Sequence, residues 1–254
     1  MYHLAKLHGL AVSFSMRSSL CRSYTFTRRN PNAATDGALF CVGRKGNGII
    51  SGMTITYQVR NSVYVNLTNR CPCACTFCLR ANAPGVYGSD SLWLEREPTQ
   101  EEVDASLDGW DFSRFREVVF CGYGEPTERL DVLLAAAARL KSRDPSLRIR
   151  VNTNGLSDLV NGKPTAALFT GKVDCLSISL NTDDPAEYLA VCRPKFGAAA
   201  YQAMLDFAKA AAKAVPEVVM TVVGEPVTDA AKQERCRALA ESLGARLRVR
   251  PYEA

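Results

Sequence analysis

A run of cysteines constrains this chain more than any other feature. Residues 71–78 are Cys-Pro-Cys-Ala-Cys-Thr-Phe-Cys and hold four of the ten cysteines in the 254-residue chain. They follow an alternating apolar segment, residues 63–67, that is typical of a β-strand. Near neighbours in one loop rarely reach the geometry of a disulfide. Dense thiolates at a strand end instead favour a soft metal: an iron–sulfur cluster, zinc or copper(I).

The spacing of these cysteines narrows the choice of metal. Cys71, Cys75 and Cys78 form a C-x3-C-x2-C pattern, whereas a structural zinc site usually takes its ligands as two separated pairs. No second pair exists, because the later cysteines are each isolated: Cys121, Cys175, Cys192 and Cys236. Three ligands in one loop leave one corner of a four-iron cluster without a protein ligand. An open metal position can bind substrate, as it does in catalytic zinc sites.

Cys73 departs from this three-cysteine pattern. It could complete the ligand shell and close the cluster, or it could be a spectator thiol. Because Cys73 and Cys75 lie only two residues apart, one cluster corner for each would strain the loop. We therefore expect Cys73 to be a spectator. Unrelated thiols or a zinc site remain the alternative to a cluster.

Length and composition predict one α/β domain with a sizeable core, since the chain is 47% hydrophobic. Ten unevenly spaced cysteines indicate a reducing compartment, and we expect a cytoplasmic protein. No apolar run approaches the roughly 20 residues of a membrane helix, and no secretory signal is convincing. Both histidines, His3 and His8, lie near the N-terminus, so His-ligated zinc and histidine general-base chemistry are excluded for the main body.

Residues 1–52 differ in composition from the rest. They contain seven Lys and Arg against one acid, Asp36, while the whole chain has a formal net charge of +5. The body at 53–254 is therefore slightly acidic and is not a nucleic-acid binder by charge. We expect residues 1–52 to be a poorly ordered extension. It is either a transit-like segment or a translated upstream stretch before a start at Met53.

From residue 53 onward, strand-like and helix-like segments alternate. The first expected helix is capped by Thr99, and Glu102 three residues later completes a capping box. Four further helices are expected at 130–140, 163–169, 198–215 and 229–243. The expected strands span 62–68, 116–120, 147–151, 173–180, 218–223 and 247–249. This alternation predicts six βα units in a parallel sheet.

Polar residues follow several of these strands at the edge where parallel α/β proteins bind ligands. Strand 116–120 is followed by Cys121-Gly122-Tyr123-Gly124-Glu125-Pro126, and strand 147–151 by Asn152-Thr153-Asn154-Gly155. Ser177, Ser179 and Asn181 lie within and after strand 173–180. The glycines permit close backbone approach to a ligand. Turn formation and strand-end capping are the alternative explanations for these residues.

The pattern of Cys71, Cys75 and Cys78, with an aromatic Phe77 before the last cysteine, resembles the radical S-adenosylmethionine (SAM) enzymes. The resemblance implies a partial (βα)6 barrel. It also implies a [4Fe-4S] cluster whose unligated iron chelates SAM, and reductive cleavage to a 5′-deoxyadenosyl radical that takes hydrogen from a substrate. The implied SAM contacts are Phe77, Gly122, Tyr123, Gly124, Glu125, Thr153, Asn154, Ser179 and Asn181.

Five further segments make residues 53–254 most similar to the TatD-associated radical SAM proteins: 64–80, 92–99, 120–131, 177–181 and 192–194. The resemblance implies an external one-electron donor, flavodoxin or ferredoxin-like, and a link to a TatD-type nuclease, and leaves the substrate unidentified. Arg80, Arg193 and Arg250 could bind a carboxylate or phosphate of that substrate. The alternatives are a modifier of a purine-like or RNA-linked substrate similar to 7-carboxy-7-deazaguanine synthase, a glycyl-radical activase, or a non-catalytic iron–sulfur or zinc protein.

Overall fold

The computed structural model describes residues 48–50, 52–81, 84–86, 88–225 and 227–251. The predicted N-terminal extension, residues 1–52, lies outside the described residues apart from 48–50 and 52. Strand β1 (Gly48–Ile50) falls within that predicted extension and pairs antiparallel with β2 (Met53–Val59). These three residues therefore belong to the sheet of the main body.

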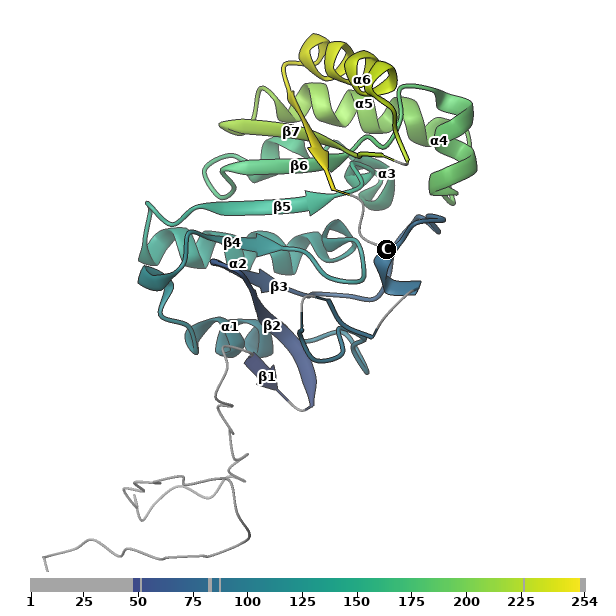
Figure 1. The fold of residues 1–254 in the computed structure, drawn as a ribbon. Coiled ribbons are helices and arrows are strands. Elements are labelled where there is room, and N and C mark those ends of the chain that lie inside the picture. The colour runs from purple at the N-terminus through teal and green to yellow at the C-terminus, as the bar shows by residue number, and fades with distance from the viewer. Residues whose placement is uncertain (1–47, 51, 82–83, 87, 226, 252–254) are drawn as a thin grey trace, which may run out of the picture. The chain divides into compact units, whose positions relative to one another are not determined.

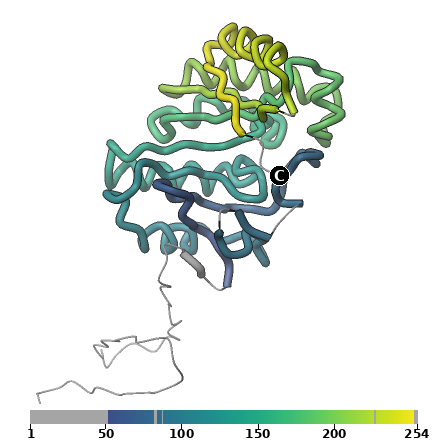
Figure 2. Tube along the Cα trace, in the orientation of Figure 1, coloured from purple at the N-terminus to yellow at the C-terminus, as the bar shows by residue number. Residues whose placement is uncertain are grey.

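The described residues form one eight-stranded sheet whose spatial order follows the chain from β1 to β8. The tube in Figure 2 shows this as a colour gradient that rises across the sheet from purple to yellow. β2 pairs antiparallel with β3 (Ser62–Val65), and every later neighbour is parallel. The remaining strands are β4 (Glu117–Phe120), β5 (Ile149–Thr153), β6 (Cys175–Ser179), β7 (Glu217–Val223) and β8 (Arg246–Arg250). All six predicted parallel strands are confirmed, and the sheet is not closed into a barrel.

Helices connect the parallel strands and lie along one face of the sheet (Figure 1). They are α1 (Gln100–Asp108), α2 (Leu130–Arg143), α3 (Ser157–Asn161), α4 (Pro185–Cys192), α5 (Ala199–Ala211) and α6 (Ala230–Ser242). Short 3-10 turns span Leu79–Ala81, Phe112–Arg114, Pro126–Arg129 and Ala166–Phe169. Over the described residues, none of these helices has the length and apolar character needed to cross a lipid bilayer.

Four of the five expected helices are confirmed as α1, α2, α5 and α6. The helix expected at 163–169 is only the 3-10 turn Ala166–Phe169. α3 and α4 were not predicted. The sequence signal for α4 is Asp184-Pro185: the Asp184 side chain accepts a hydrogen bond from the Glu187 backbone N–H, and Pro185 opens the first turn.

The two faces of the sheet differ because successive strand residues point to opposite sides. Val118, Ile149 and Leu176 belong to the buried apolar core on the helix-covered face. Their neighbours in sequence, Glu117, Arg150 and Cys175, line a polar cavity instead. The face without helices therefore carries charged and polar side chains, and the site described below lies at its carboxyl end.

The N-terminus of α1 offers a direct test of the capping assignment. The Thr99 hydroxyl accepts a bond from the Glu102 N–H at 3.2 Å, and the Glu102 carboxylate accepts one from the Thr99 N–H at 2.9 Å. Thr99→Ala removes the first of these bonds, and we expect it to lower the free energy of unfolding by about 1 kcal/mol. Urea denaturation measures the loss. Thr99→Ser keeps the bond and is the control, and equal stability of the alanine and serine variants would contradict the assignment.

Candidate active site at the carboxyl ends of the strands

The cysteine loop begins six residues after β3 ends and passes over the carboxyl end of the sheet. Cys71, Cys75 and Cys78 are half-buried, and Phe77 packs partly buried against the apolar core. Cys73 differs, since its residue surface is only 5% exposed and it belongs to the core cluster itself. The three predicted ligands are therefore more accessible than the predicted spectator.

The loop is held by the last turn of α4 and the residues directly after it. The Ala74 N–H donates to the Cys192 carbonyl at 3.1 Å, and the Thr76 N–H donates to the Val191 carbonyl at 2.9 Å. Cys73 and Pro194 form an antiparallel bridge. Residues 191–195 thus back the cysteine loop as a short strand would.

Arg80 supports the same loop from inside. Its guanidinium donates to the carbonyls of Asn69 at 3.4 Å, Tyr123 at 3.5 Å and Cys73 at 3.5 Å. Arg193 is exposed and takes a left-handed backbone conformation, with φ of 45°, at the end of α4. Of the three arginines considered for substrate binding, Arg80 is therefore occupied within the protein.

Neighbouring thiols shift one another's pKa in this loop. The pKa of Cys75 is lowered to about 4 because it accepts hydrogen bonds from the thiols of Cys192 and Cys73. The pKa of Cys73 is raised by its bonds to Cys71 and Cys75, so it holds its proton. A thiolate is the form that binds metal. The lowered pKa of Cys75 favours the thiolate, and the raised pKa of Cys73 favours the thiol.

The donor set has the chemistry of an iron–sulfur site. Cys71, Cys75 and Cys78 are half-buried thiols of one loop, and soft thiolates are the ligands that hold iron–sulfur clusters. In the part of the chain that the structure describes, no three His, Cys, Asp or Glu side chains are arranged to hold one metal ion. The three thiols therefore fit the ligand chemistry of a cluster.

The turn after β4 lies tightly against the start of the cysteine loop. A Cβ atom on Gly124 would lie 2.2 Å from the Thr68 carbonyl oxygen, and one on Gly122 would lie 1.9 Å from the Asn66 side-chain oxygen. Only glycine permits this approach. The Tyr123 side chain packs in a separate cluster with Tyr57, edge-on to Trp93. The Tyr123 backbone is therefore part of the turn, while its ring packs away from the turn against Tyr57 and Trp93.

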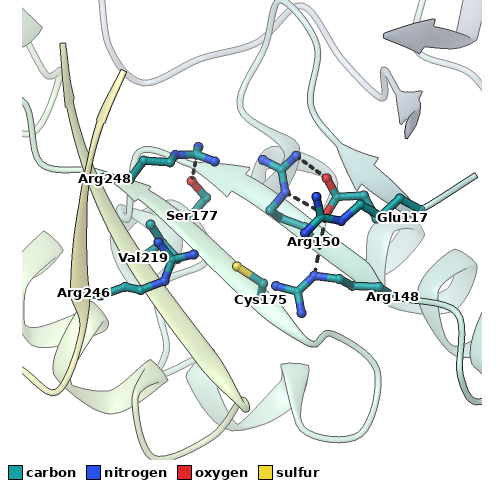
Figure 3. Close-up of a pocket in the computed structure, with 9 residues that line it drawn as sticks. Glu117, Arg148, Arg150, Cys175, Ser177, Val219, Arg246 and Arg248 are labelled. Carbon is teal, nitrogen blue, oxygen red and sulfur yellow. Dashed lines mark hydrogen bonds and ion pairs between the residues drawn. The ribbon is translucent and has the colours of Figure 1, made fainter. Parts of the chain in front are cut away.

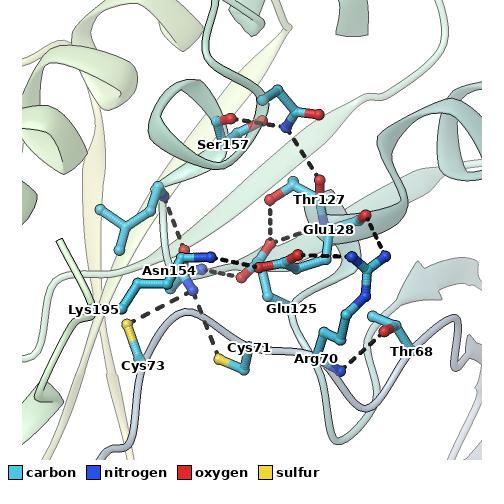
Figure 4. Close-up of polar contacts among 12 residues, drawn as sticks. Thr68, Arg70, Cys71, Cys73, Glu125, Thr127, Glu128, Asn154, Ser157 and Lys195 are labelled. Carbon is cyan, nitrogen blue, oxygen red and sulfur yellow. Dashed lines mark hydrogen bonds and ion pairs between the residues drawn. The ribbon is translucent and has the colours of Figure 1, made fainter.

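Glu125 joins the turns after β4 and β5 (Figure 4). Its carboxylate accepts hydrogen bonds from the Thr127 N–H at 3.1 Å, the Thr127 hydroxyl at 2.8 Å, the Thr153 hydroxyl at 2.7 Å and the Asn154 N–H at 2.7 Å. Burial raises the pKa of Glu125, although these four donors act in the opposite direction. The carboxylate, predicted as a direct SAM contact, is thus occupied by protein donors and positions the two turns.

Asn154 extends from this network toward the cysteines. Its side-chain nitrogen lies 3.9 Å from the Cys71 sulfur and 3.8 Å from the Cys73 sulfur. Its side-chain oxygen accepts a hydrogen bond from the Leu156 N–H at 2.9 Å. The turn after β5 therefore contacts the cysteine loop directly, as the strand-end rule predicted.

The residues near the end of β6 separate into two groups. Ser179 is half-buried in the last position of the strand, and Asn181 follows with a left-handed φ of 66°. Asn181 is 8% exposed and donates to the Cys192 sulfur at 3.2 Å, while its side-chain oxygen has no partner among the described residues. Ser177 lies lower on the sheet and accepts a hydrogen bond from Arg248 at 3.3 Å. An unpartnered buried oxygen beside the cysteine loop is typical of a site that binds a ligand.

Sequence reasoning missed several supporting residues. The Glu97 carboxylate forms ion pairs with Arg70 at 2.6 Å and Arg129 at 3.2 Å. It also accepts a hydrogen bond from the Thr68 hydroxyl at 2.7 Å. Cys192 lies beside Cys75 and was taken as an isolated thiol. No local pattern marks these contacts, because the partners are distant in sequence. The available signal was that Glu97 and Cys192 lie in segments 92–99 and 192–194, which carried the family resemblance.

Comparison with known proteins agrees with this geometry. A family model described as the Radical SAM superfamily matches residues 65–237, which span the cysteine loop, β4 to β7 and the first part of α6. The chain belongs to the radical SAM superfamily. Members of this superfamily are enzymes that use a [4Fe-4S] cluster and SAM, so the chain is a radical SAM enzyme.

Individual relatives match parts of the chain. A GTP 3′,8-cyclase from Mycobacterium ulcerans (strain Agy99) is 32% identical over 135 residues, 51% of this chain and 33% of that protein. The match thus spans about a third of that relative's length.

Solved radical SAM structures share the fold. A radical SAM methyltransferase from Sphaerobacter thermophilus superposes with a TM-score of 0.52 at 17% identity, covering 77% of this chain and 57% of that one. Streptococcus suis SuiB bound to precursor peptide SuiA gives 0.54 at 15% identity, covering 78% and 40%. Methylornithine synthase (PylB) gives 0.51 at 13% identity, covering 76% and 53%. At identities this low, the likeness concerns the fold alone.

Proposed function

We propose that Cys71, Cys75 and Cys78 hold one [4Fe-4S] cluster and that this chain cleaves SAM reductively to abstract hydrogen from a substrate. The observation that carries the proposal is the contact between the cysteine loop and the turns after β4 and β5. Asn154 approaches Cys71 from the β5 turn, and Gly124 lies against the backbone of residues 68–70. The bound cluster and SAM supply the radical chemistry, and the protein supplies binding and orientation.

The chain's own residues divide the remaining work. The backbone of Gly122, Tyr123 and Gly124, together with Ser179 and Asn181, surrounds the position proposed for SAM. Phe77 packs beside the last cysteine. Glu125, Thr153 and Asn154 hold the two turns in register through the buried carboxylate. We assign Glu125 as a positioning residue, because its four protein donors leave little capacity for a ligand.

We further propose membership of the TatD-associated group, with an external flavodoxin or ferredoxin-like electron donor, a functional link to a TatD-type nuclease and a cytoplasmic location. Two segments that carried this resemblance have structural roles that support it. Glu97, in segment 92–99, pairs with Arg70 beside the cysteine loop. Cys192 and Pro194, in segment 192–194, pair with the loop backbone.

A purine-like substrate is the second candidate. The name of the curated relative specifies GTP, and it is 32% identical over 135 residues. The polar face of the sheet offers arginines to an anionic substrate of this kind. This candidate shares the same cluster and SAM site, so it concerns the substrate only.

Anaerobic reconstitution tests the proposed function. The protein is loaded with iron and sulfide, reduced with dithionite and incubated with SAM, and 5′-deoxyadenosine is measured by chromatography. We expect 5′-deoxyadenosine to form and the electron paramagnetic resonance signal of the reduced cluster to change when SAM is added. A cluster whose signal ignores SAM, with no product, would support the non-catalytic alternative.

Cys73→Ala tests the spectator assignment. Cys73 is buried and donates to its neighbours, so we expect the variant to retain the iron content of one [4Fe-4S] cluster and to change SAM cleavage by less than about threefold. Iron analysis and the 5′-deoxyadenosine assay measure both quantities. Loss of the cluster in this variant would show that Cys73 is a ligand. Cys236→Ala removes a buried thiol of α6 and controls for the loss of core packing.

A further inference from the structure

Arginines at the starts of β4 and β5 and along β8 gather on the helix-free face of the sheet, below the proposed SAM site. A cavity of about 150 Å³ is lined by Arg116, Arg148 and Arg150 on one side and by Arg246 and Arg248 on the other. Cys175 and Ser177 of β6 lie between them (Figure 3). Arg250, two residues beyond Arg248 along β8, points to the same face because strand residues alternate.

The carboxylates near this cavity are already paired with three of these arginines. Glu117 accepts Arg150 at 2.8 Å, and Glu217 accepts Arg148 and, at 2.6 Å, Arg246. Burial alone would raise the pKa of Glu117, but the neighbouring Arg150 lowers it, so Glu117 stays ionised. These pairs leave Arg248 and Arg250 without a carboxylate partner in the described part of the chain.

Arg248 and Arg250 carry unused hydrogen-bond donors. The Nε atom of each is buried and has no hydrogen-bond partner among the residues described. Arg248 donates only to the Ser177 hydroxyl at 3.3 Å. Burial and the nearby charges of Arg150 and Arg250 lower the pKa of Arg248, which indicates that like charges face each other there. Half-buried cations that repel one another and keep buried, unpartnered Nε donors favour an anionic ligand.

We propose that this arginine cavity binds an oxyanion of the substrate, a phosphate or a carboxylate, through Arg248 and Ser177, with Arg250 beside the cavity on the same face of β8. The assignment rests on the proposed function, since it names the substrate class of the same enzyme. The cavity lies toward the amino ends of β5, β6 and β8, and Arg250 leads from it toward the carboxyl ends. The Arg250 carbonyl accepts the Gly224 N–H at 2.8 Å there. A substrate anchored in the cavity would thus extend along the sheet toward the cysteine loop.

Calorimetric titration of the reconstituted holoenzyme tests the proposal without measuring catalysis. Inorganic phosphate and succinate are the two probes, and they distinguish a phosphorylated from a carboxylated substrate. We expect at least one probe to bind, and Arg248→Gln to weaken its binding about tenfold or more. Arg237→Gln changes the same charge at an exposed position of α6 and should bind as the wild type does. Equal affinity in all three proteins, or no binding of either probe, would overturn the proposal.

Two further measurements distinguish anion binding in the cavity from SAM binding and from loss of folding. Titration in saturating SAM should leave the anion affinity unchanged, and displacement by SAM would assign the arginines to the SAM site and overturn the proposal. Thermal unfolding without added anion checks folding: because Arg248 faces like charges, Arg248→Gln should melt no lower than the wild type. If the Arg248→Gln variant melts at a lower temperature than the wild type, Arg248→Lys is tested in its place. This variant keeps the positive charge but lacks the planar guanidinium, so it should still weaken anion binding. A failed SAM-cleavage assay leaves these titrations intact, so the two proposals fail separately.

Discussion

Replacing Cys71, Cys75 or Cys78 with alanine is expected to remove the iron–sulfur absorbance and to lower 5′-deoxyadenosine formation at least about 100-fold. Each replacement deletes one of three ligands in a loop that offers no spare accessible thiol. Cys73 is buried among apolar side chains and acts as a hydrogen-bond donor, so it is badly placed as a substitute. Iron and sulfide content, visible absorbance and product chromatography on anaerobically reconstituted protein measure the loss.

The matched controls are other buried thiols. Cys236→Ala removes a cysteine from α6, and Cys73→Ala removes one from the loop itself. Both should keep the cluster. In the assigned set, the three cysteines hold three of the four irons and leave the fourth open. A cluster that survives any of the three replacements would therefore contradict the assignment. Circular dichroism separates ligand loss from unfolding, because it reports the helices and the sheet and not the metal centre.

Replacing Gly124 with alanine is expected to cost about 3 kcal/mol of unfolding free energy and to lower SAM cleavage at least about 100-fold. The new Cβ would lie 2.2 Å from the Thr68 carbonyl oxygen and 2.6 Å from the Arg70 carbonyl oxygen. Both are backbone atoms that cannot swing aside as a side chain would. The turn after β4 must therefore move away from the cysteine loop. Urea denaturation and the cleavage assay measure the two effects.

Gly109→Ala is the control for the Gly124 variant. Gly109 follows α1 with an ordinary φ of −72°, and its new Cβ would meet only the Ser106 carbonyl oxygen at 3.5 Å. We expect its stability to stay within about 0.5 kcal/mol of the wild type. If Gly124→Ala were as stable and as active as Gly109→Ala, the close contact between turn and loop would not position the site.

Much of the fold could be predicted because its signals are local. The strand patterns at 116–120 and 218–223 and the Ala-rich helix at 198–215 predicted β4, β7 and α5 to within a few residues. Thr99 and Glu102 predicted the start of α1. α4 was missed because its eight residues are short and weakly periodic, and because its signal is a cap and not an apolar pattern. The helix expected at 163–169 contains Pro164 near its start, and only its last four residues form a 3-10 turn.

The candidate site was only partly predictable. The strand-end rule brought Gly124, Thr153 and Asn154 to one edge, and the structure places them beside the cysteine loop. Glu125 was expected to face the ligand. Its burial at 3% exposure and its four internal donors depend on how β4 and β5 pair, which no local pattern reveals. Ser177 was grouped with Ser179. Ser179 is the last residue of β6, whereas Ser177, two residues earlier, lines the arginine cavity.

By itself, the sequence determined the donor chemistry and the class of fold. The spacing of Cys71, Cys75 and Cys78 within one short loop limits how they can bind metal, and alternating strand and helix periods dictate a parallel sheet. Tertiary structure alone decided that residues 191–195 back the loop and that Arg150 of β5 and Arg248 of β8 meet on one face. The physical reason is the separation along the sequence between the residues that interact. A ligand spacing or a helix cap involves residues only a few positions apart. A shared face across β5, β6 and β8 is instead set by register and the coiling of the whole sheet.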